Sequence, residues 1–421
     1  MKPKAIRGMN DLLPETLGTW RYLESKIIQI VESYGFNEIR LPIMERTELF
    51  KRSIGEDTDI VEKEMYTFDD RNQESITLRP EATASMVRAG ITNGLLHNQK
   101  QKMWTMGPMF RYEKPQKGRY RQFYQFNIEA MGYAGPDIDA ELIILCARMW
   151  KVLRIKNLSL KINSLGNKNT RSKYREDLIN YFSDNLDNLD ENSKNRLHSN
   201  PLRILDSKNP EMKKLIDEAP ILLDYLDSES EEHFNKLKNI LSDAGIDFQV
   251  NPKLVRGLDY YNRTVFEWET DVLGSQGAVC SGGRYDDLIE KIGGKSTPAI
   301  GWAMGMERLV SLYEYSNEKI NKISPHIYIA IDGDEAQKKA FQISEELREL
   351  NPKIRIQLNM GGGSFKSQLK RADKSNSNYA IIIGLDELKN DYLSLKSLRR
   401  NQEQVKIPFS KINELTNIIF D

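Results

Sequence analysis

The spacing between strand-like segments changes along this chain, and it limits the folds that each part can adopt. In the N-terminal part, strand-like runs occur at 75–79, 103–112 and 122–131, with one helical stretch at 81–93 between them. Parallel neighbours need long crossover connections, and a series of such crossovers is missing here. We therefore expect a mainly antiparallel sheet in this part of the chain.

The C-terminal part has the opposite pattern. After a polar connector at 316–324, strand-like and helix-like segments alternate: strand 326–331, helix 335–350, strand 354–358, helix 364–374 and strand 379–384. Such alternation is typical of a parallel or mixed sheet with helices packed on it. A chain of 421 residues is also long enough for roughly two to four domains.

The start of the N-terminal part combines a helical pattern with an extended run. Apolar residues recur at helical spacing from Trp20 to Tyr34, and Gly35 interrupts the pattern before an extended run at 38–44. Pro42 lies inside that run and cannot donate a hydrogen bond to a neighbouring strand. We expect a helix followed by a strand at an edge or an interface.

The middle of the chain is richer in charge and in Asn. Apolar residues at helical spacing within 167–247 predict a small helical insertion. Strand-like runs resume at 253–258 and 264–269, and a glycine-rich stretch then leads into a helix at 306–315. We expect a larger domain in two parts, 1–166 and 252–318, with the insertion at 167–251 between them. A C-terminal domain is expected at 325–421.

The composition excludes several classes of protein. Lys plus Arg number 61 and Asp plus Glu also number 61, so a nucleic-acid partner must be bound by local basic patches. No apolar run approaches the roughly 18 residues that cross a bilayer, and the N-terminus lacks the apolar region of a signal peptide. We expect a cytoplasmic protein without a membrane partner.

The sequence also argues against metal centres and Walker-type phosphate sites. Cys146 and Cys280 have no Cys or His at metal-ligand spacing, and none of the four histidines has such a neighbour. Gly294-Lys295-Ser296 resembles the end of a P-loop, but the position of its first glycine is occupied by Ile289. We therefore expect no residues that hold a metal.

One segment, 110–129, combines basic and aromatic residues. Five basic residues and one acidic residue lie within 111–121, interleaved with Tyr and Phe. Arginine can bind phosphate through two hydrogen bonds, and aromatic rings stack on bases, so the segment is a candidate nucleotide site. Taken alone, a segment of this kind is more often a solvated charged hairpin.

A second segment, 299–309, combines small residues with an arginine. Gly301, Ala303 and Gly305 share one face of a predicted strand and leave a flat surface where a planar ring can approach the backbone. Arg308 follows at the start of a predicted helix. The alternative is close packing of a helix on a sheet.

These segments resemble the three motifs of class II aminoacyl-tRNA synthetases. Residues 35–44, which include Pro42, resemble motif 1, residues 110–129 resemble motif 2, and residues 301–309 resemble motif 3. The three motifs also occur in the order that the family has. A chance match of all three is therefore hard to obtain.

Three further stretches narrow the resemblance to the histidyl-tRNA synthetase family. The sequences LVRGLDYY at 254–261 and SGGRYDDL at 281–288 are similar to its two histidine-specific signatures, and TLRPEAT at 77–83 also matches the family. The likeness extends from Gly8 to Asp373, which is nearly the whole chain.

The resemblance implies a fold and a two-step reaction. Histidine and ATP give histidyl-adenylate and pyrophosphate, and the histidyl group then passes to the 3′ end of tRNA(His). ATP is thus a substrate, and Mg²⁺ bridges its phosphates. The implied fold is α+β, with a mainly antiparallel class II synthetase catalytic sheet, helices, a helical insertion and a C-terminal α/β anticodon-binding domain. Motif 1 implies a homodimer, because its strand forms the class II dimer interface.

The same resemblance assigns the residues that act on ATP. Negative charge develops on oxygen atoms in this chemistry, so positioned cations matter more than a protein nucleophile. The implied catalytic residues are Arg256 and Arg111, both on the α-phosphate. The implied ATP-binding residues are Arg111, Arg119, Phe123, Arg256 and Arg308, with Phe123 stacked on adenine.

Histidine has an α-ammonium group and two imidazole nitrogens, so its pocket needs carboxylates and hydroxyls. Glu81, Thr83 and Gln125 match the family's ligands of the ammonium group. Glu129, Tyr261 and Tyr285 match the family's imidazole contacts. Tyr260 lines the same pocket and either faces the ligand or packs beneath it.

The resemblance implies two contact regions for tRNA(His). The motif 2 loop, with Lys117 and Arg119, contacts the acceptor end. In the C-terminal domain, the predicted helix at 364–374 provides Lys366, Lys370 and Arg371 for phosphate contacts. These side chains could equally form a solvated helix face.

Two other functions remain open at this point. A non-catalytic synthetase-like regulatory subunit of histidine biosynthesis has a similar core, but such relatives usually have degenerate signatures and no anticodon domain. Arg256, the Tyr260-Tyr261 pair and the C-terminal α/β sequence favour the enzyme. A pure tRNA-binding module would leave the nucleotide-like site unexplained.

Overall fold

The chain forms two compact units, Met1–Ile320 and Asn321–Asp421. The computed structural model describes residues 2–55, 58–116, 118–207, 209–274, 277–317, 320 and 323–420. Within these ranges, none of the helices is long and apolar enough to cross a membrane.

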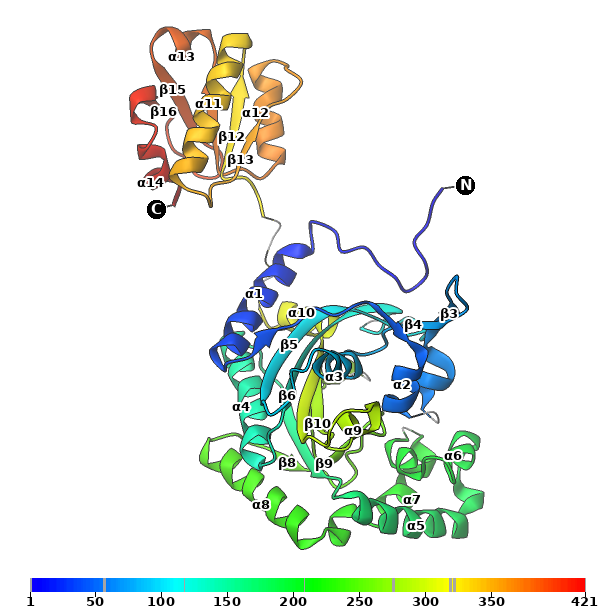
Figure 1. The fold of residues 1–421 in the computed structure, drawn as a ribbon. Coiled ribbons are helices and arrows are strands. Elements are labelled where there is room, and N and C mark those ends of the chain that lie inside the picture. Colours follow the sequence, from blue (N-terminus) through cyan, green and yellow to red (C-terminus); the bar gives the residue numbers. More distant parts are fainter. Residues whose placement is uncertain are drawn as a thin grey trace. The chain divides into compact units, whose positions relative to one another are not determined.

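The larger unit is built on an eight-stranded sheet with the order β1-β5-β6-β11-β10-β9-β7-β8 (Figure 1). The two outermost pairs, β1 with β5 and β7 with β8, are parallel, and every pair between them is antiparallel. The mainly antiparallel sheet is thus confirmed. Its strands are β1 (Asn37–Glu38), β5 (Gln101–Phe110), β6 (Gln122–Met131), β7 (Ser159–Ser164), β8 (Gln249–Val250), β9 (Asn262–Glu269), β10 (Ala278–Arg284) and β11 (Ala299–Gly305).

The two faces of this sheet differ in chemistry, and β6 shows the difference clearly. Phe126, Ile128 and Ala130 are fully buried in the main apolar core, whereas the residues between them, Asn127 and Glu129, are polar. Four helices contribute to the core on the apolar face: α1 (Leu17–Ser33), α4 (Pro136–Val152), α8 (Ser228–Asp243) and α10 (Met306–Ser316). On the other side of the sheet, Figure 1 shows α3 (Thr83–Thr92) and α9 (Leu288–Ile292).

The helices of the expected insertion divide between two apolar clusters. α8 packs on α4 and buries Phe234, Leu237 and Leu241 in the main core of the sheet. Five of the other helical segments contribute to a second cluster, which also includes residues of α3 and α9. These segments are α5 (Lys168–Asp184), η3 (Pro201–Asp206), η4 (Pro210–Met212), α7 (Lys213–Asp217) and η5 (Leu222–Tyr225). The short segments η2 (Leu186–Asn188) and α6 (Glu191–Arg196) are each followed by a leucine of this cluster, Leu189 and Leu197.

The prediction of one strand at 38–44 is wrong, because coil that contains Pro42 separates β1 from β2 (Met44–Arg46). Proline has no N–H for a strand ladder, and Arg79 Nη1 instead donates to the carbonyl oxygens of Leu41 and Pro42, at 3.3 and 3.4 Å. β2 begins a separate antiparallel sheet with the order β2-β4-β3. The other elements here are α2 (Thr47–Ile54), the π-helix η1 (Ile60–Glu64), β3 (Tyr66–Asp69) and β4 (Ser75–Leu78).

The prediction of a strand at 253–258 is also wrong, since this segment is coil. Asn163 Nδ2 donates to the carbonyl oxygens of Pro252 and Leu254, both at 3.1 Å. A side chain thus satisfies backbone groups that a strand would have paired in a ladder. The coil carries Arg256.

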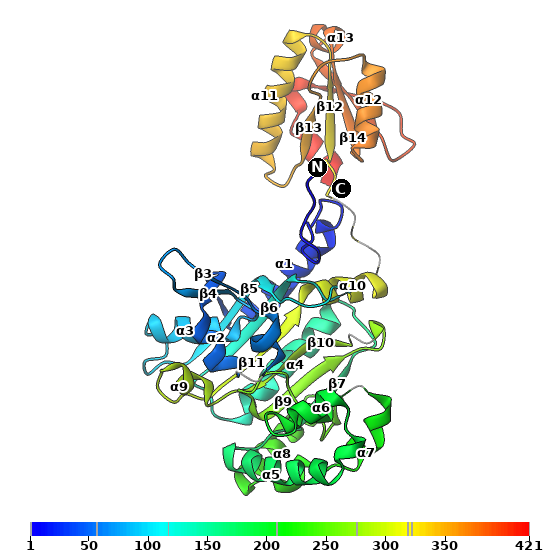
Figure 2. The same cartoon turned by 90° about the vertical axis from the view of Figure 1, so that its right-hand side faces the viewer.

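The smaller unit has a five-stranded mixed sheet, as the alternating pattern predicts. Its order is β13-β12-β14-β15-β16, with β12 parallel to both neighbours and the remaining pairs antiparallel. Figure 2 shows α11 and α12 on either side of this sheet. Its elements are β12 (Ile327–Ile331), α11 (Asp334–Leu350), β13 (Ile356–Leu358), α12 (Phe365–Lys374), β14 (Tyr379–Ile383), α13 (Leu385–Lys389), β15 (Tyr392–Ser397), β16 (Val405–Pro408), η7 (Phe409–Lys411) and α14 (Glu414–Phe420).

A buried ionic cluster connects α4, α8 and β10 in the larger unit. Arg284 Nε donates to Asp139 Oδ2 at 3.1 Å, and His233 Nε2 lies 2.8 Å from the same oxygen. Asp139 and Arg284 are completely buried. Burial opposes the charge on Asp139, but the guanidinium of Arg284 holds the pKa of this carboxyl below its usual range.

Replacing Asp139 by alanine is expected to destabilise the larger unit strongly. Asp139→Ala leaves the buried charge of Arg284 without its main partner, which should lower the free energy of unfolding by about 3 to 5 kcal/mol. Urea unfolding followed by tryptophan fluorescence checks this. The five tryptophans, Trp20, Trp104, Trp150, Trp268 and Trp302, all lie in the larger unit, so the signal reports that unit alone.

Lys236→Ala is the control, because the pair of Lys236 with Glu232 is exposed. Exposed pairs contribute about 0 to 1 kcal/mol, so this variant should unfold almost like the wild type. A loss of less than about 1 kcal/mol in Asp139→Ala would contradict a stabilising role for the buried cluster.

Candidate active site

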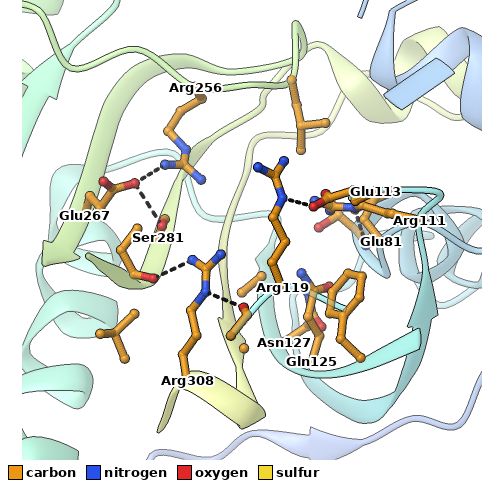
Figure 3. Close-up of a pocket in the computed structure, with 18 of the residues that line it drawn as sticks. Glu81, Arg111, Glu113, Arg119, Gln125, Asn127, Arg256, Glu267, Ser281 and Arg308 are labelled. Atoms are coloured by element: carbon orange, nitrogen blue, oxygen red, sulfur yellow. Dashed lines mark hydrogen bonds and ion pairs between the residues drawn. The ribbon is translucent and has the colours of Figure 1, made fainter. Parts of the chain in front are cut away.

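A cavity of about 440 Å³ opens on the polar face of the eight-stranded sheet (Figure 3). All of its lining residues belong to the larger unit. The predicted site residues that line it are Glu81, Thr83, Arg111, Arg119, Phe123, Gln125, Arg256, Tyr260, Tyr261 and Arg308. The structure thus brings together side chains from segments that are far apart in the sequence.

Glu129 lies behind the cavity wall and is fully buried. Thr83 Oγ1 donates to its Oε1 at 2.6 Å, and the hydroxyl of Tyr285 donates to its Oε2. Burial raises the pKa of Glu129 to about 8, although both hydroxyls favour the charged form. The Glu129 side chain therefore holds a proton more tightly than an ordinary carboxyl group.

Gly301 was expected to leave a flat surface for a planar ring, but the structure shows a different reason for glycine at this position. Gly301 is paired with Glu129 across β11 and β6, and a Cβ added to Gly301 would overlap Oε2 of Glu129. This glycine therefore makes room for a carboxylate of the chain itself. Ala303 and Gly305 do line the cavity, so the surface available to a planar ring is confined to these two positions.

Glu81 is a second buried carboxylate in the site. Its two oxygens accept hydrogen bonds from the backbone N–H groups of Thr83 and Ala84, at 2.7 and 2.8 Å. Both donors lie in the first turn of α3, where backbone N–H groups lack partners within the helix. Burial raises the pKa of Glu81, while these hydrogen bonds oppose the rise.

Three tyrosine rings form one cluster beside these carboxylates. The ring centroid of Tyr260 lies 4.6 Å from that of Tyr261 and 5.6 Å from that of Tyr285. Burial raises the pKa of each phenol, so the hydroxyls remain protonated donors at neutral pH. Tyr260 is almost fully buried and is one of the residues on the cavity wall.

Arg256 reaches the cavity from the coil before β9. Its Nη1 donates to Glu267 Oε2 at 2.5 Å, and Ser281 Oγ donates to the same oxygen at 3.0 Å (Figure 3). The guanidinium lies 5.8 Å from the ring centroid of Tyr261. Burial opposes the charge on Arg256, but Glu267 more than compensates, so the pKa of Arg256 is raised.

Arg111 approaches the same space from the end of β5. Its Nε donates to the carbonyl oxygen of Pro80 at 2.9 Å, and its guanidinium lies 5.3 Å from the ring centroid of Phe123. Burial lowers the pKa of Arg111. The ring of Phe123 therefore has the guanidinium of Arg111 beside it.

Arg308, Arg119 and Arg203 also contribute guanidinium groups to the cavity lining. Arg308 donates to the carbonyl oxygens of Gly118 and Ala278, at 3.2 and 2.7 Å, and Arg119 is paired with Glu113. Burial lowers the pKa of Arg308, and the nearby charges of Arg119 and Arg111 lower it further. Neighbouring arginines of this group therefore repel one another, and a polyanionic ligand would relieve that repulsion.

Several cavity residues were missed by the sequence analysis. Asn127 could have been found from the two-residue period of β6, since it shares a face with Gln125. Glu267 and Ser281 carry no local signal, because their importance depends on contact with Arg256.

Glu307 was missed for the same reason as Glu267 and Ser281. It accepts a bifurcated hydrogen bond from the backbone N–H of Tyr124, at 2.9 and 3.1 Å, and burial raises its pKa to about 7. This contact ties the start of α10 to β6.

Of the predicted tRNA contacts that the structure describes, Arg119 alone lines the cavity. Lys117 lies outside the described residues. Lys366 and Lys370 are exposed on α12 of the smaller unit, one helical turn apart. Arg371 is also exposed, and its Nη2 donates to the carbonyl oxygen of Gly362 at 2.6 Å.

Known proteins are similar to this chain over almost its whole length. The family model described as "Histidyl-tRNA synthetase" matches residues 8–309, and the one described as "Anticodon binding domain" matches residues 326–416. A "Histidine--tRNA ligase" of Hydrogenovibrio crunogenus is 54% identical over 409 residues, covering 97% of this chain and 96% of that protein. One of Legionella pneumophila is 54% identical over 417 residues, covering 98% and 97%. The crystal structure of apo S. aureus histidyl-tRNA synthetase matches with a TM-score of 0.82 and 34% identity, covering 98% of this chain and 99% of that chain.

The raised pKa of Glu129 predicts a pH-dependent stability that glutamine would remove. The folded pKa, about 8, exceeds the ordinary value of 4.5, so the contribution of this group is complete below pH 4.5 and is lost as the pH rises through 8. Between about pH 5 and pH 8.5, the free energy of unfolding of the wild type should fall relative to Glu129→Gln by up to about 4 kcal/mol.

Urea unfolding followed by tryptophan fluorescence at both pH values measures this difference. Glu231→Gln on α8 is the control, since Glu231 is exposed and should leave the pH dependence of the wild type unchanged. Parallel pH dependences for the wild type and Glu129→Gln would contradict the buried, protonated state of Glu129.

Proposed function

Since this chain belongs to the histidyl-tRNA synthetase family and is an ATP-dependent ligase that joins L-histidine to tRNA(His), we propose that the cavity over β6 is where it activates histidine. Histidine and ATP react to histidyl-adenylate, and the histidyl group is then transferred to the 3′ end of the tRNA. The alternative of a non-catalytic regulatory subunit is not favoured. The observation that carries the proposal is that five guanidinium groups and the buried carboxylate of Glu81 line one space, with the buried Glu129 behind its wall.

The carboxylates and hydroxyls form the histidine side of the site in this proposal. Glu81, Thr83 and Gln125 accept hydrogen bonds from the α-ammonium group, and Gln125 Oε1 supports this role because it is buried without a partner among the described residues. Glu129 and Tyr285 bind the imidazole from behind the wall. One hydroxyl that now donates to Glu129 must give way to the imidazole N–H.

Two tyrosines complete the proposed histidine pocket. Tyr261 contacts the imidazole from the cavity wall, and Tyr260 packs against Tyr261 on the same wall. Their protonated hydroxyls can donate only to a nitrogen that carries no proton. The pocket thus distinguishes an imidazole, which has both a donor and an acceptor, from an apolar ring of similar size.

The arginines form the ATP side. The carboxylate of histidine attacks the α-phosphorus, a new P–O bond forms, and pyrophosphate leaves with its electron pair. Arg111 and Arg256 hold the α-phosphate as negative charge develops on its oxygens, while Arg119 and Arg308 hold the outer phosphates. Glu267 supports this role for Arg256, since it orients the guanidinium before ATP arrives. Arg119 would exchange Glu113 for a phosphate.

Adenine is proposed to lie over Phe123, Ala303 and Gly305. The ring of Phe123 and the small side chains at the end of β11 line the same cavity. The atoms nearest to a Cβ added at Gly305 belong to Arg308, at 3.9 Å, which leaves room for a flat ring beside that guanidinium. Arginine and aromatic rings both stack on a base.

Mg²⁺ is proposed to enter with ATP as part of the substrate. No group of three or more His, Cys, Asp or Glu side chains among the described residues could hold a metal ion by itself. Mg²⁺ often binds through substrate phosphates together with one or two carboxylates. Glu267 and Glu307 line the cavity and are the carboxylates that fit this need. The ion would reduce the charge of the triphosphate.

The tRNA is proposed to contact both units. Lys117 and Arg119 in the motif 2 loop bind the acceptor end. Lys366, Lys370 and Arg371 on α12 bind phosphates near the anticodon, and the exposure of all three side chains supports this role.

We also propose a cytoplasmic homodimer formed through the motif 1 region. Ile43, Met44 and Phe68 support this interface, since they are large apolar side chains exposed in or next to the three-stranded sheet. An exposed apolar patch of this kind is typical of a protein interface.

Replacing Arg256 should slow adenylation much more than transfer. Removing one preorganised donor to developing charge costs about 10² to 10³ in rate, so single-turnover formation of histidyl-adenylate should slow by that factor in Arg256→Ala. Transfer from preformed adenylate to tRNA breaks no bond to pyrophosphate and should slow less. Rapid-quench measurements of the two steps check this.

Two further variants make the test of Arg256 specific. Arg256→Lys should recover only part of the rate, because lysine keeps the charge but not the planar fork. Arg148→Ala removes an exposed arginine of α4 and should behave like the wild type. Adenylation within a few-fold of the wild type in Arg256→Ala, or an equal loss in both steps, would exclude the proposed role.

Neutralising the lysines of α12 should weaken tRNA binding without affecting adenylation. In Lys366→Ala combined with Lys370→Ala, the KM for tRNA(His) should rise and the slope of log affinity against log salt should become less negative by about 1 to 2. Histidine-dependent ATP–pyrophosphate exchange should stay unchanged, because the cavity belongs to the larger unit. Lys338→Ala on α11 is the control. An unchanged KM for tRNA in the double variant would argue that these lysines form a merely solvated helix face.

A further inference from the structure

Asn127 is a cavity residue to which none of the roles above applies. Its side chain is 1% exposed, and both atoms of its amide, Oδ1 and Nδ2, lack a hydrogen-bond partner among the described residues. Figure 3 shows it next to Gln125 in the cavity. A buried amide without partners costs free energy, so the chain carries this cost in its unliganded form.

The surroundings of Asn127 explain why its amide has no partner within the chain. Its backbone is paired with Thr105 of β5 on one side and with Ala303 of β11 on the other. Ala303 presents only a methyl group at this position of the cavity wall. A larger polar residue there could have paired with the amide, whereas alanine leaves both Nδ2 and Oδ1 available to a ligand.

The place of Asn127 on β6 indicates which part of a ligand it meets. Residues two apart on one strand face are separated by about 6.6 to 6.8 Å, so Asn127 lies midway between Gln125 and Glu129. On the proposed function, Glu129 binds the imidazole and Gln125 the α-ammonium end. On the same proposal, the carboxylate of histidine, which is bonded to the same carbon atom as the ammonium group, faces the α-phosphate held by Arg111 and Arg256.

The available hydrogen-bond donors favour the carboxylate as the group that Asn127 binds. Glu81, Thr83 and Gln125 already offer acceptors to the ammonium group. Among the described lining residues, the buried donors without an acceptor are Nδ2 of Asn127 and Nε of Arg256, and the arginine is needed at the phosphate. A neutral amide can donate to a carboxylate without adding a positive charge to a site that already contains five arginines.

We infer that Asn127 is a histidine-binding residue whose Nδ2 donates to the substrate carboxylate and, after activation, to the carbonyl oxygen of the adenylate. This inference rests on the proposed place of histidine in the cavity. It makes Asn127 a specificity residue for amino acids with a free carboxylate.

Histidinol separates this role from a general effect on the pocket, because it has a hydroxymethyl group in place of the carboxylate. In Asn127→Ala, the KM for histidine in ATP–pyrophosphate exchange should rise about tenfold or more, since a buried partner of a charged group is lost. The inhibition constant of histidinol and the KM for ATP should change less than twofold. A histidine KM within twofold of the wild type, or an equal weakening of histidinol, would overturn the inference.

Asn127→Asp tests which substrate group is bound. An added carboxylate would repel the carboxylate of histidine, so histidine should bind more weakly than to Asn127→Ala. Tighter binding than in Asn127→Ala would instead place the α-ammonium group at this position and overturn the assignment. Because the introduced carboxyl group could take up a proton, the comparison is made at two pH values.

Two controls run alongside. Thr105→Ala removes an equally buried polar side chain directly opposite Asn127 and outside the cavity lining, so it should leave the KM for histidine unchanged. Glu129→Gln tests the proposed pocket itself. Weakened histidine binding in Glu129→Gln with no change in Asn127→Ala would exclude Asn127 alone, whereas no change in either variant would exclude the proposed pocket.

Discussion

The two-residue alternation of β6 is the constraint on which the rest of the site depends. Phe126, Ile128 and Ala130 lie in the main apolar core, and the residues between them belong to the face that carries the cavity. A shift of one residue in the pairing of β6 with β5 or β11 would bury the carboxylate of Glu129 in the apolar core. The apolar face thus fixes the register, and the register fixes which polar groups meet the ligand.

Burial shifts pKa values in opposite directions on the acidic and the basic side of the cavity. Burial raises the pKa of the carboxyl groups of Glu81 and Glu129 and lowers the pKa of the guanidinium groups of Arg111 and Arg308. A substrate pair that carries an ammonium group and a triphosphate offers each side the charge that it lacks. The groups are held in place before binding, so little reorganisation is needed during the reaction.

The site is also connected to the core behind it. Arg284 is held by the buried carboxylate of Asp139, and the hydroxyl of the next residue, Tyr285, donates a hydrogen bond to Glu129. Successive residues near the end of β10 thus serve opposite faces of the sheet. A residue of the apolar side, Asp139 of α4, can in this way determine where a hydroxyl of the proposed histidine pocket lies.

The sequence by itself determined the elements with a clear local period and several of the residues that line the cavity. The strands β5 and β6, the helices α1 and α10 and the mixed sheet of the smaller unit follow from patterns within single short segments, and the motifs identify residues that the structure gathers in one cavity. The tertiary structure decided the rest. Whether 253–258 is a strand depends on Asn163, about 90 residues earlier, and whether Gly301 serves a ligand or a neighbour depends on Glu129. Such contacts join residues far apart in the chain, so no local pattern records them, and the open amide of Asn127 becomes visible only when its surroundings are assembled.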